Sequence, residues 1–578
     1  MNFNSALNQL ESSDLVRRLH EEELAYLFKH ALVQDTAYAS LLKNERKRLH
    51  RAIGETLERE YPHARVENAA LLTKHFLEAG DDAKILEYAT CAGDAEARVF
   101  AKAEAIEHYR AALDAALRLD APRETIIELV TKLGRMYELR GDYQDALAVY
   151  ERLSALAQSR DDARFELAAL MLQATIRATP TPVFEPRLGQ AICDRALARA
   201  RELQDGAAEA RALWNLLLLN GFTGRYQDAV VYGEQSLALA RQLHLTEQIA
   251  YTLNDLGNYG YFATGQFAKA RAALTEARGL WRELDKLDML SDNLNNSSIF
   301  ETMWGAFAPA RAFSDEALAV SERVGSLWGQ ALAHTSRGVL DAEVGNYGAA
   351  LAQLQTGYRI AQQTNSGILF IAATNLTLAY SMVGAFDLAF DVIQVADQEI
   401  EIPLYRAPAK AALAYITFLR GDLQGAQLLL ENAHRGGAMD LVFSYLPSII
   451  AEGEIRLACG DAAYAVNYLE TLAKNLISFG IQNFVADADL YRGRALTALH
   501  RFDEARAAFE RAYEYATRIR SQRALWQILL HWGNLERAQN NLERADELET
   551  QARALIASIA ATLPENYRAG FLRMANRA

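Results

Sequence analysis

Small and apolar residues recur along this chain with a period of about 40 residues. The recurring unit is a Gly, an aromatic or apolar residue two positions later, and an Ala three positions after that. Eight copies carry all three features: Gly141-Tyr143-Ala146, Gly224-Tyr226-Ala229, Gly265-Phe267-Ala270, Gly305-Phe307-Ala310, Gly345-Tyr347-Ala350, Gly384-Phe386-Ala389, Gly421-Leu423-Ala426 and Gly460-Ala462-Ala465. Three looser copies keep the spacing without the Gly: Phe100-Lys102-Ala105, His500-Phe502-Ala505 and Asn540-Leu542-Ala545. The period predicts one repetitive fold instead of the roughly four domains that the length alone would suggest.

Each feature of the unit has a physical reason in a pair of antiparallel helices. The Gly ends the first helix in a left-handed conformation that costs other residues energy. The second helix starts at once, and its Ala allows a close approach while the aromatic residue fills the seam. A further Gly, twelve residues before the Ala, would serve the same approach from the first helix in five units: Gly134, Gly338, Gly453, Gly493 and Gly533. In one unit the stretch between the two glycines, Gly257 to Gly265, is one residue longer than in the unit of Gly134.

These pairs resemble the tetratricopeptide repeat, a helix-turn-helix with small residues at the crossing. The match is close in LGRMYELRGDYQDALAVYERL, from Leu133 to Leu153. The unit of about 40 residues is longer than the usual 34 or so, which is similar to the solenoids of bacterial signalling ATPases and large transcriptional activators. The resemblance implies an all-α fold, a right-handed superhelical solenoid of about 12 helix-turn-helix repeats.

We expect three parts along the chain. A partial winged-helix or junction segment covers residues 1–60, the solenoid covers residues 61–560, and a tail or cap covers residues 561–578. Near residues 160–203 we expect a degenerate repeat with a proline-rich loop, because three prolines cluster there: Pro180, Pro182 and Pro186.

The amino-terminal segment follows its own pattern. Apolar and polar residues alternate around an acidic stretch in LVRRLHEEELAYLFKHAL, which predicts a short hairpin, and two helices are predicted in HALVQDTAYASLLKNERKRLHRAIGETLERE. The residues FKHALVQDTAYASLL resemble the junction where the winged-helix module of STAND-class ATPases, especially those linked to class III adenylate/guanylate cyclases, passes into its repeat arm. The resemblance implies a partial winged-helix remnant. In that family the nucleotide-binding and cyclase domains precede this junction.

Composition and charge narrow the class of partner. The chain has 33 Gly and 10 Pro in 578 residues, too few for the turns of an all-β protein. Its 60 Lys and Arg against 74 Asp and Glu leave a net charge of −14, which argues against nucleic acid or an anionic membrane as the main partner. A basic run from Lys43 to Arg51 suggests nucleic-acid binding as a third reading. We favour a solvated helix face there, because an apolar stripe shares the helix: Leu42, Leu49, Ile53 and Leu57.

Motifs for catalysis are absent from the sequence. It contains no Gly-Lys pair and therefore no P-loop, no His-Glu-x-x-His and no Cys-x-x-Cys. The three cysteines, Cys91, Cys193 and Cys459, have neither metal nor redox spacing. We expect a protein that is not an enzyme, needs no cofactor or metal and, without a signal peptide or a long apolar stretch, is cytoplasmic.

A row of polar residues is the pattern that points to a binding site. Two positions before the close-contact site, five successive central repeats carry Asn215, Asp255, Asn296, Ser336 and Asn375. In tetratricopeptide domains this position tends to face the concave groove, where an Asn amide can donate to and accept from an extended peptide backbone. Four further residues would lie nearby: Trp214, Asn254, Asn258 and Asn295. The alternative is a row of polar residues on a solvent-facing helix side, which needs no ligand.

The sequence therefore predicts a non-catalytic, protein- or peptide-binding arm in intracellular signal transduction, with no nucleic acid and no membrane as partner. Because repeats are expected to contact only their neighbours, a ligand in the groove would change the curvature of the solenoid. The alternative function is the regulatory C-terminal portion of an ATPase or adenylate/guanylate cyclase whose catalytic domains are missing from this chain. In that case a signalling ATPase or cyclase module is a second partner.

Overall fold

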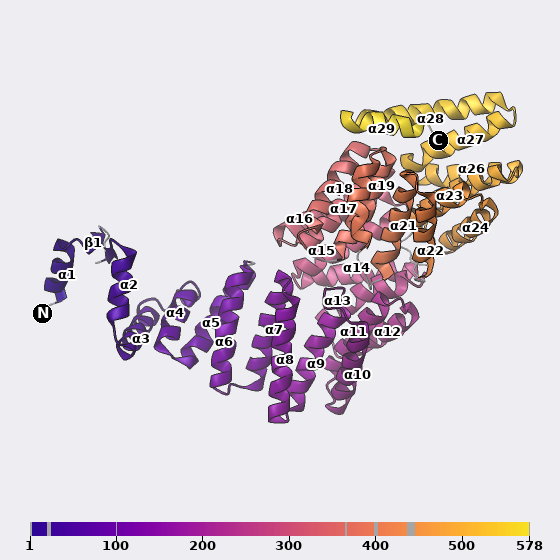
Figure 1. Cartoon of the computed structure of the whole chain (residues 1–578). Coiled ribbons are helices and arrows are strands. Elements are labelled where there is room, and N and C mark those ends of the chain that lie inside the picture. The colour runs from indigo at the N-terminus through magenta and orange to yellow at the C-terminus, as the bar shows by residue number, and fades with distance from the viewer. Residues whose placement is uncertain are drawn as a thin grey trace. The chain divides into compact units, whose positions relative to one another are not determined.

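The structure is a computed structural model that describes residues 3–19, 25–99, 101–364, 367–397, 403–435 and 445–576. Phe100, part of one looser repeat copy, lies outside the described residues. The chain divides into two compact units, Met1–Leu156 and Ala157–Ala578. Apart from one hairpin, both units consist of helices, most of them in antiparallel pairs (Figure 1). The all-α fold class with helix-turn-helix repeats is confirmed, and the predicted divisions at residues 60 and 560 stay predictions.

Unit 1 begins with the predicted hairpin and continues into helix pairs. Strands β1 and β2 pair in antiparallel register, with Val16 opposite Phe28 and Leu19 opposite Ala25. Its elements are α1 Phe3–Ser12, β1 Val16–Leu19, β2 Ala25–Phe28, α2 Ala31–Ser40, α3 Lys43–Glu60, α4 Ala69–Ala79, α5 Asp82–Arg98, α6 Lys102–Arg118, α7 Arg123–Arg140 and α8 Tyr143–Arg160, whose last residues belong to unit 2.

The amino-terminal helices of unit 1 bury little. Helix α2 has no buried residue, and Gly54 is the buried residue of α3. Three residues of the apolar stripe remain exposed to solvent, Leu42 by 75%, Leu49 by 42% and Ile53 by 44%. The stripe on α3 is therefore an uncovered apolar surface that lies beside the basic run.

Unit 2 contains the remaining helix pairs. The three prolines lie in or at the end of the connection between α9 and α10. Pro180 and Pro182 lie within it, and Pro186 is the first residue of α10. The elements are α9 Ala163–Ala178, α10 Pro186–Glu202, α11 Gly206–Phe222, α12 Tyr226–Gln242, α13 Thr246–Asp255, η1 Leu256–Phe262, α14 Phe267–Glu283, α15 Leu287–Met303, α16 Phe307–Arg323, α17 Leu327–Glu343, α18 Tyr347–Ala361, α19 Ile368–Met382, α20 Phe386–Ile393, η2 Gln394–Asp397, α21 Pro403–Leu419, α22 Leu423–Arg435, α23 Tyr445–Ala458, α24 Ala462–Ser478, α25 Val485–Ala498, α26 Phe502–Ile519, α27 Gln522–Ala538, α28 Leu542–Thr562 and α29 Glu565–Ala575.

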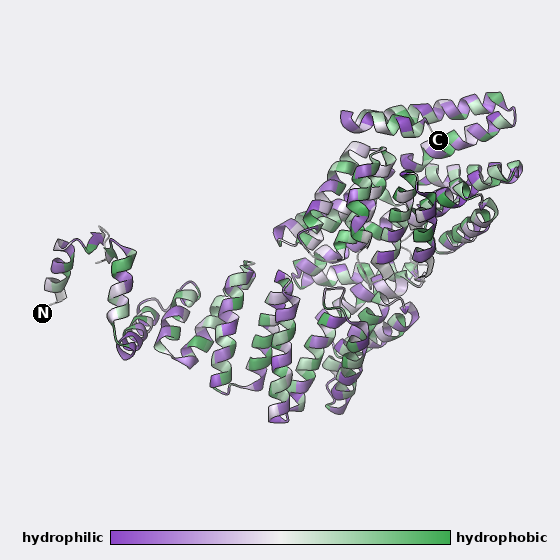
Figure 2. Ribbon diagram, in the orientation of Figure 1, coloured by the Kyte–Doolittle hydropathy of each residue, from purple (hydrophilic) through white to green (hydrophobic). Residues whose placement is uncertain are grey.

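The helix ends and crossings follow the repeat pattern. All eight turn glycines have a positive φ, from 73° at Gly384 to 96° at Gly421, which confirms the predicted left-handed helix ends. At the crossings the helices leave no room for a side chain, because a Cβ on Gly134 would lie 2.2 Å from the Tyr150 ring. Hydrophobic and hydrophilic residues share most helices (Figure 2), as helices with one buried face require. In the described residues, no helix is both long enough and apolar enough to span a bilayer.

The repeat with one extra residue contains a π-helix. Helix α13 continues without interruption into η1, Leu256–Phe262, which is π-helical. A π-helical turn holds more residues than an α-helical turn, so it absorbs an insertion inside a helix. The repeat pattern resumes afterwards, since Gly265 ends the helix with a φ of 76°. The insertion seen in the sequence therefore changes the local direction of side chains and leaves the repeat intact.

The C-terminal helices of unit 2 pack back against its central helices. The backbone N–H groups of Gln482 and Asn483 both donate to the carbonyl of Met303 at 3.2 Å. At the C-terminal end the rings of Phe571 and Tyr347 lie 5.6 Å apart. The expectation that repeats contact only their neighbours is therefore wrong for unit 2, because these contacts join helices separated by several repeats.

A buried ion cluster lies at this contact. Arg523 of α27 is 1% exposed and donates to both carboxylate oxygens of Asp487, at 2.7 and 2.8 Å. It also donates to Oε1 of Glu343 on α17 at 2.9 Å, across 180 residues of sequence. Ser521 donates to the other oxygen of Glu343 at 2.6 Å. One guanidinium therefore serves two carboxylates in a place that water does not reach.

Replacing Arg523 by Met should destabilise unit 2 strongly. Two buried carboxylates would lose their cation, which typically costs about 3–5 kcal/mol. The matched control is Arg282→Met, because Arg282 pairs with Glu316 at 2.7 Å while both side chains stay about half exposed, and such pairs contribute at most about 1 kcal/mol. Urea unfolding measures both. Equal unfolding free energies for the two variants would contradict a structural role for the cluster.

Candidate functional site

The nine predicted groove residues all lie on first helices of the pairs in unit 2, from α11 to α19. Seven are buried: Asn215, Asn254 and Asn295 at 0% exposure, Asn258 at 2%, Ser336 at 7%, and Trp214 and Asp255 at 8%. Asn296 and Asn375 keep partial exposure. The seven buried residues do not lie on a solvent-facing helix side, so the alternative of a hydrated polar row does not describe them. As a binding site the row stays a prediction, and its burial means that its polar groups need partners inside the protein.

Two carboxylates form the centre of the row. Trp214 Nε1 donates to Asp255 Oδ2 at 2.7 Å, from one first helix to the next. Asn254 Nδ2 donates to Asp255 Oδ1 and to Asp292 Oδ2, both at 3.1 Å. Asn296 Nδ2 also donates to Asp292 Oδ2, at 3.1 Å. Asp255 and Asp292, here called the carboxylate pair, are thus held together by neutral donors from three successive repeats.

A second set of contacts fixes the orientation of the Asn254 amide, which bridges the two carboxylates. Asn293 Nδ2 donates to Asn254 Oδ1 at 3.0 Å and to the carbonyl of Leu274 at 3.1 Å. Arg278 donates to Ser297 Oγ at 2.9 Å and reaches Asn293 Oδ1 at 3.4 Å. Because the oxygen of Asn254 accepts from Asn293, its nitrogen must face the carboxylate pair. Arg278, the basic residue in this network, is directed at neutral groups.

The carboxylate pair has no cation of its own. No Lys or Arg of the described residues forms an ion pair with Asp255 or Asp292. Burial raises the pKa of Asp255 to about 7, and the charge of Asp292 adds to this shift. Burial likewise raises the pKa of Asp292 to about 6, while the hydrogen bond from Asn254 opposes the shift. Near neutral pH the pair is therefore a costly, partly protonated site that a positive charge would stabilise.

Two buried amides in the same region have no hydrogen-bond partner in the part of the chain that the structure describes. Neither the Nδ2 nor the Oδ1 atom of Asn215 is paired, and the same holds for Asn258. Leaving a buried polar group unpaired typically costs about 1–3 kcal/mol. These two side chains are therefore unfavourable in the free protein as it stands.

The other members of the row are not joined to the carboxylate pair. Asn375 donates to the carbonyl of Ile371 at 2.8 Å on its own helix. Asn295 donates to the carbonyl of Gly329 at 3.3 Å while its oxygen is unpaired, and Ser336 Oγ is unpaired as well. The structure thus joins four of the nine, Trp214, Asn254, Asp255 and Asn296, in one network with Asp292, and the other five lie outside it.

Sequence reasoning missed Asp292 and Asn293. A signal for Asp292 was available, because it stands four residues before Asn296 and so lies on the same helix face, one turn earlier. Asn293 lies off that face, and nothing in the repeat pattern marks it.

Unit 1 carries an open groove of about 770 Å³ along α5. Its charged side chains are largely paired, since Asp94 accepts from Tyr109 at 2.7 Å and from Lys132 at 2.9 Å. Burial raises the pKa of the Cys91 thiol, which disfavours the reactive thiolate. The lining residues are Glu87, Thr90, Cys91, Asp94, Ala97, Arg98, Tyr109 and Lys132. This groove offers a mixed-charge surface without a distinct catalytic or metal-binding group.

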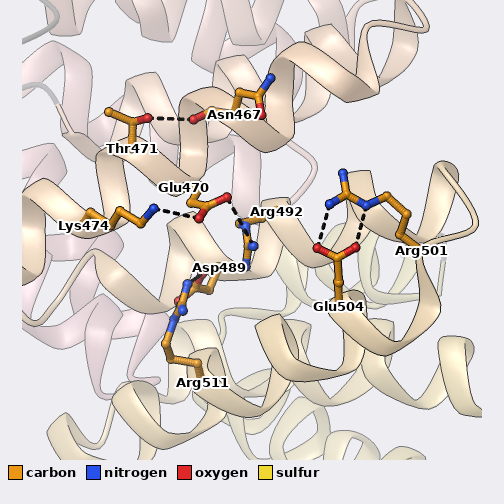
Figure 3. Close-up of polar contacts among 9 residues, drawn as sticks. All are labelled: Asn467, Glu470, Thr471, Lys474, Asp489, Arg492, Arg501, Glu504 and Arg511. Atoms are coloured by element: carbon orange, nitrogen blue, oxygen red, sulfur yellow. Dashed lines mark hydrogen bonds and ion pairs between the residues drawn. The ribbon is translucent and has the colours of Figure 1, made fainter.

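A polar cluster between α24 and α26 consists of ion pairs and of one hydrogen bond from Thr471 to the carbonyl of Asn467 (Figure 3). Asp489 accepts from Arg511, Glu470 accepts from Lys474 at 2.8 Å, and Arg501 pairs with Glu504. Asp487 and Asp489 are thus bound to arginines. No group of three His, Cys, Asp or Glu side chains suited to a metal ion occurs in the described ranges.

Comparison with known proteins identifies similar folds. No protein-family model matches the chain, and no curated protein matches its sequence. A Rap protein complexed with Competence and Sporulation Factor is 13% identical over 61% of this chain and 98% of that one, with a TM-score of 0.44. Cut9, from the APC/C hetero-tetramer Cut9–Hcn1, is 14% identical over 85% of this chain and 94% of that one, with a TM-score of 0.48.

A STAND protein from Pyrococcus horikoshii is also similar, through a chain that includes a tetratricopeptide repeat sensor. It is 13% identical, with a TM-score of 0.35, and the match covers 75% of this chain and 58% of that one. The helix-turn-helix pairs and left-handed glycine ends described above agree with the tetratricopeptide-like repeat that the sequence predicts.

Removing the charge of the carboxylate pair should change how stability depends on pH. The folded-state pKa values of about 7 and about 6 lie above the ordinary 3.8. The folded protein therefore binds more protons between about pH 4 and pH 7, and its free energy of unfolding falls as the pH rises through that window. Asp255→Asn/Asp292→Asn should be more stable than the wild type at pH 8, by several kcal/mol, with little difference near pH 4.

Urea unfolding at a series of pH values measures this difference. The matched control is Glu276→Gln/Glu316→Gln, which removes two carboxylates that are about half exposed and paired with arginines. The control should keep the pH profile of the wild type. A pH profile of the Asp variant that matches the wild type would show that the pair is ionised at ordinary pKa values.

Proposed function

We propose that this chain is a non-catalytic solenoid that binds a protein or peptide at the inner helix faces of unit 2 and acts as a sensor arm in intracellular signal transduction. The observation that carries the proposal is the pair of buried, unpartnered amides of Asn215 and Asn258. An amide can donate to and accept from an extended peptide backbone at the same time. A bound peptide would therefore satisfy groups that the free protein leaves unsatisfied.

Because the row is buried, binding of a peptide requires a change in the structure of unit 2. Because Asn215 and Asn258 are at most 2% exposed, a peptide reaches them only if the first helices of neighbouring pairs move apart. Binding is then coupled to a rearrangement of unit 2, and that rearrangement is the signal. Each amide contact contributes only about 1 kcal/mol net, so several repeats must bind the ligand together.

A second candidate function is the regulatory portion of an ATPase or adenylate/guanylate cyclase. The observation that favours it is the uncovered apolar surface of the amino-terminal segment, where Leu32 is 77% and Leu42 is 75% exposed. Apolar surface of this kind indicates contact with another protein module. Translation of the DNA upstream of the gene, in all frames, tests this function, which requires a P-loop or cyclase domain there or in an associated protein. A cytoplasmic location and the absence of a nucleic-acid partner belong to both proposals.

Truncating the two partly exposed amides should weaken peptide binding. In Asn296→Ala/Asn375→Ala two contacts to a peptide backbone are lost, so retention of peptides should fall about tenfold or more. The helical circular dichroism should not change. The measurement passes a pool of random nonapeptides over the immobilised full chain and quantifies the retained peptides by mass spectrometry. Asn467→Ala, at an exposed position of α24, is the control, and undiminished retention in the double variant would sink the proposal.

Replacing the unpartnered amides by Leu should separate stability from function. Asn215→Leu/Asn258→Leu removes polar groups that have no partner, so the free protein should become more stable, by about 1 kcal/mol or more per site. The same variant should retain no peptides. The control is Asn293→Leu, which should destabilise, because Asn293 makes two hydrogen bonds with its Nδ2. Urea unfolding and the nonapeptide pool give the two readouts, and a stabilised variant that still retains peptides would count against the amides as ligand contacts.

A further inference from the structure

We propose that the carboxylate pair of Asp255 and Asp292 binds a cationic side chain of the peptide ligand, the ammonium of a Lys or the guanidinium of an Arg. The inference rests on the proposed function and specifies one chemical feature of the ligand. It goes beyond backbone recognition, because it assigns a charged subsite with its own selectivity.

The hydrogen bonds of the pair leave acceptor positions open. A carboxylate offers about four lone-pair positions. Asp255 accepts one hydrogen bond on each oxygen. Asp292 accepts two on Oδ2, and its Oδ1 accepts none from the described residues. Asp292 also keeps partial exposure to solvent. Oδ1 of Asp292 is therefore the oxygen of the pair that is left to accept from an incoming N–H donor.

The negative charges at and around the pair favour the binding of a cation. Asp288, one helical turn before Asp292, adds negative charge and raises the pKa of Asp292 further. Arg278 does not compensate, because it is directed at Asn293 and Ser297. The buried carboxylate of Asp255 and the partly buried one of Asp292 repel each other and have no cation among the described residues, so one ammonium or guanidinium between them would remove this repulsion. The direct donors to the pair, from Trp214, Asn254 and Asn296, are all neutral.

The unpartnered amide of Asn215 points to the same ligand. Asn215 occupies on α11 the repeat position that Asp255 occupies on α13 and Asn296 on α15. These helices lie in register, since Trp214 of α11 reaches Asp255 and Asn254 of α13 reaches Asp292. Asn215 therefore precedes Asp255 in the row by one repeat, is 0% exposed, and neither of its amide atoms has a hydrogen-bond partner among the described residues. A peptide that places a basic side chain at the pair brings its backbone to this amide.

A divalent metal ion fits the pair less well. Metal ions bind oxygen atoms whose lone pairs are free, whereas three of the four oxygens here already accept hydrogen bonds from N–H groups. Although Asp288 lies one turn away, no group of three acidic, His or Cys side chains among the described residues is arranged to hold a metal ion. Donors that carry N–H groups match this set of acceptors better.

The test uses four pools of nonapeptides that are random except for a fixed central residue. That residue is Lys, Arg, N-acetyl-lysine or norleucine, so that charge is varied at similar length. The immobilised full chain should retain the Lys or Arg pool about tenfold or more above the acetyl-lysine and norleucine pools. Preference for one basic pool then distinguishes an ammonium ligand from a guanidinium ligand.

Variants assign the selectivity to the pair. In Asp255→Asn/Asp292→Asn the preference for basic pools should disappear, so that the Lys and Arg pools are retained no more than the norleucine pool. Glu276→Gln/Glu316→Gln, which removes the same charge elsewhere in unit 2, should keep the preference. Asp292→Asn alone provides a milder variant, because Asp292 is partly exposed. Circular dichroism and gel filtration check that each variant is folded.

The outcomes separate the two proposals. Equal retention of all four pools by the wild type overturns the cationic subsite and leaves the proposed function standing. Retention of no pool overturns the proposed function itself. A basic preference that persists in the double Asn variant also overturns the assignment, because the cation then binds elsewhere. Stabilisation of the wild type by Mg²⁺ or Ca²⁺ alone, lost in the double variant, would identify the pair as a metal site and overturn the proposal.

Discussion

The contact of Arg523 with Glu343 and Asp487 holds together parts of unit 2 that are far apart in sequence. All three side chains are buried, so water cannot solvate a charge that loses its partner. The cluster is stable only when every member is present, because a carboxylate left alone in this place would lose far more energy than a surface ion pair provides. It therefore fixes how α27 and α25 lie against α17. Contacts between residues this far apart in sequence also make the unfolding of unit 2 more cooperative than that of an open solenoid, in which each repeat contacts only its neighbours.

Burial changes what polar residues on the first helices do. In an open groove Asn and Asp side chains would be hydrated and would cost nothing. In unit 2 they are buried, and each needs a partner within the protein. Trp214, Asn254 and Asn296 find one in the carboxylate pair. Asn215 and Asn258 do not. The inner faces therefore combine a satisfied network with unsatisfied groups beside it, an arrangement that favours a ligand able to complete it.

Local features of this fold could be predicted from the sequence, and long-range ones could not. The turn glycines, the Gly-to-Ala crossings and the amino-terminal hairpin each depend on residues within one repeat or one turn, so spacing revealed them. The return of the C-terminal helices depends on the pitch of the whole solenoid. Arg523, Glu343 and Asp487 look like ordinary charged positions in the repeat pattern. The same limit applies to the candidate site: the row Asn215, Asp255, Asn296 was visible, while its burial followed from contacts that the pattern does not contain.

The π-helix Leu256–Phe262 gives the solenoid a place where one side chain can point differently from its counterparts. In the neighbouring repeats the residue that follows the close-contact site is apolar: Leu218, Ile299, Val339 and Leu378. At this position the π-helical repeat has Asn258, on a turn that is wider and rotates less per residue than an α-helix. A single inserted residue thus rotates the side chains of one repeat relative to those of the other repeats. It lets one repeat acquire a new orientation for an amide while the repeats on either side keep their spacing.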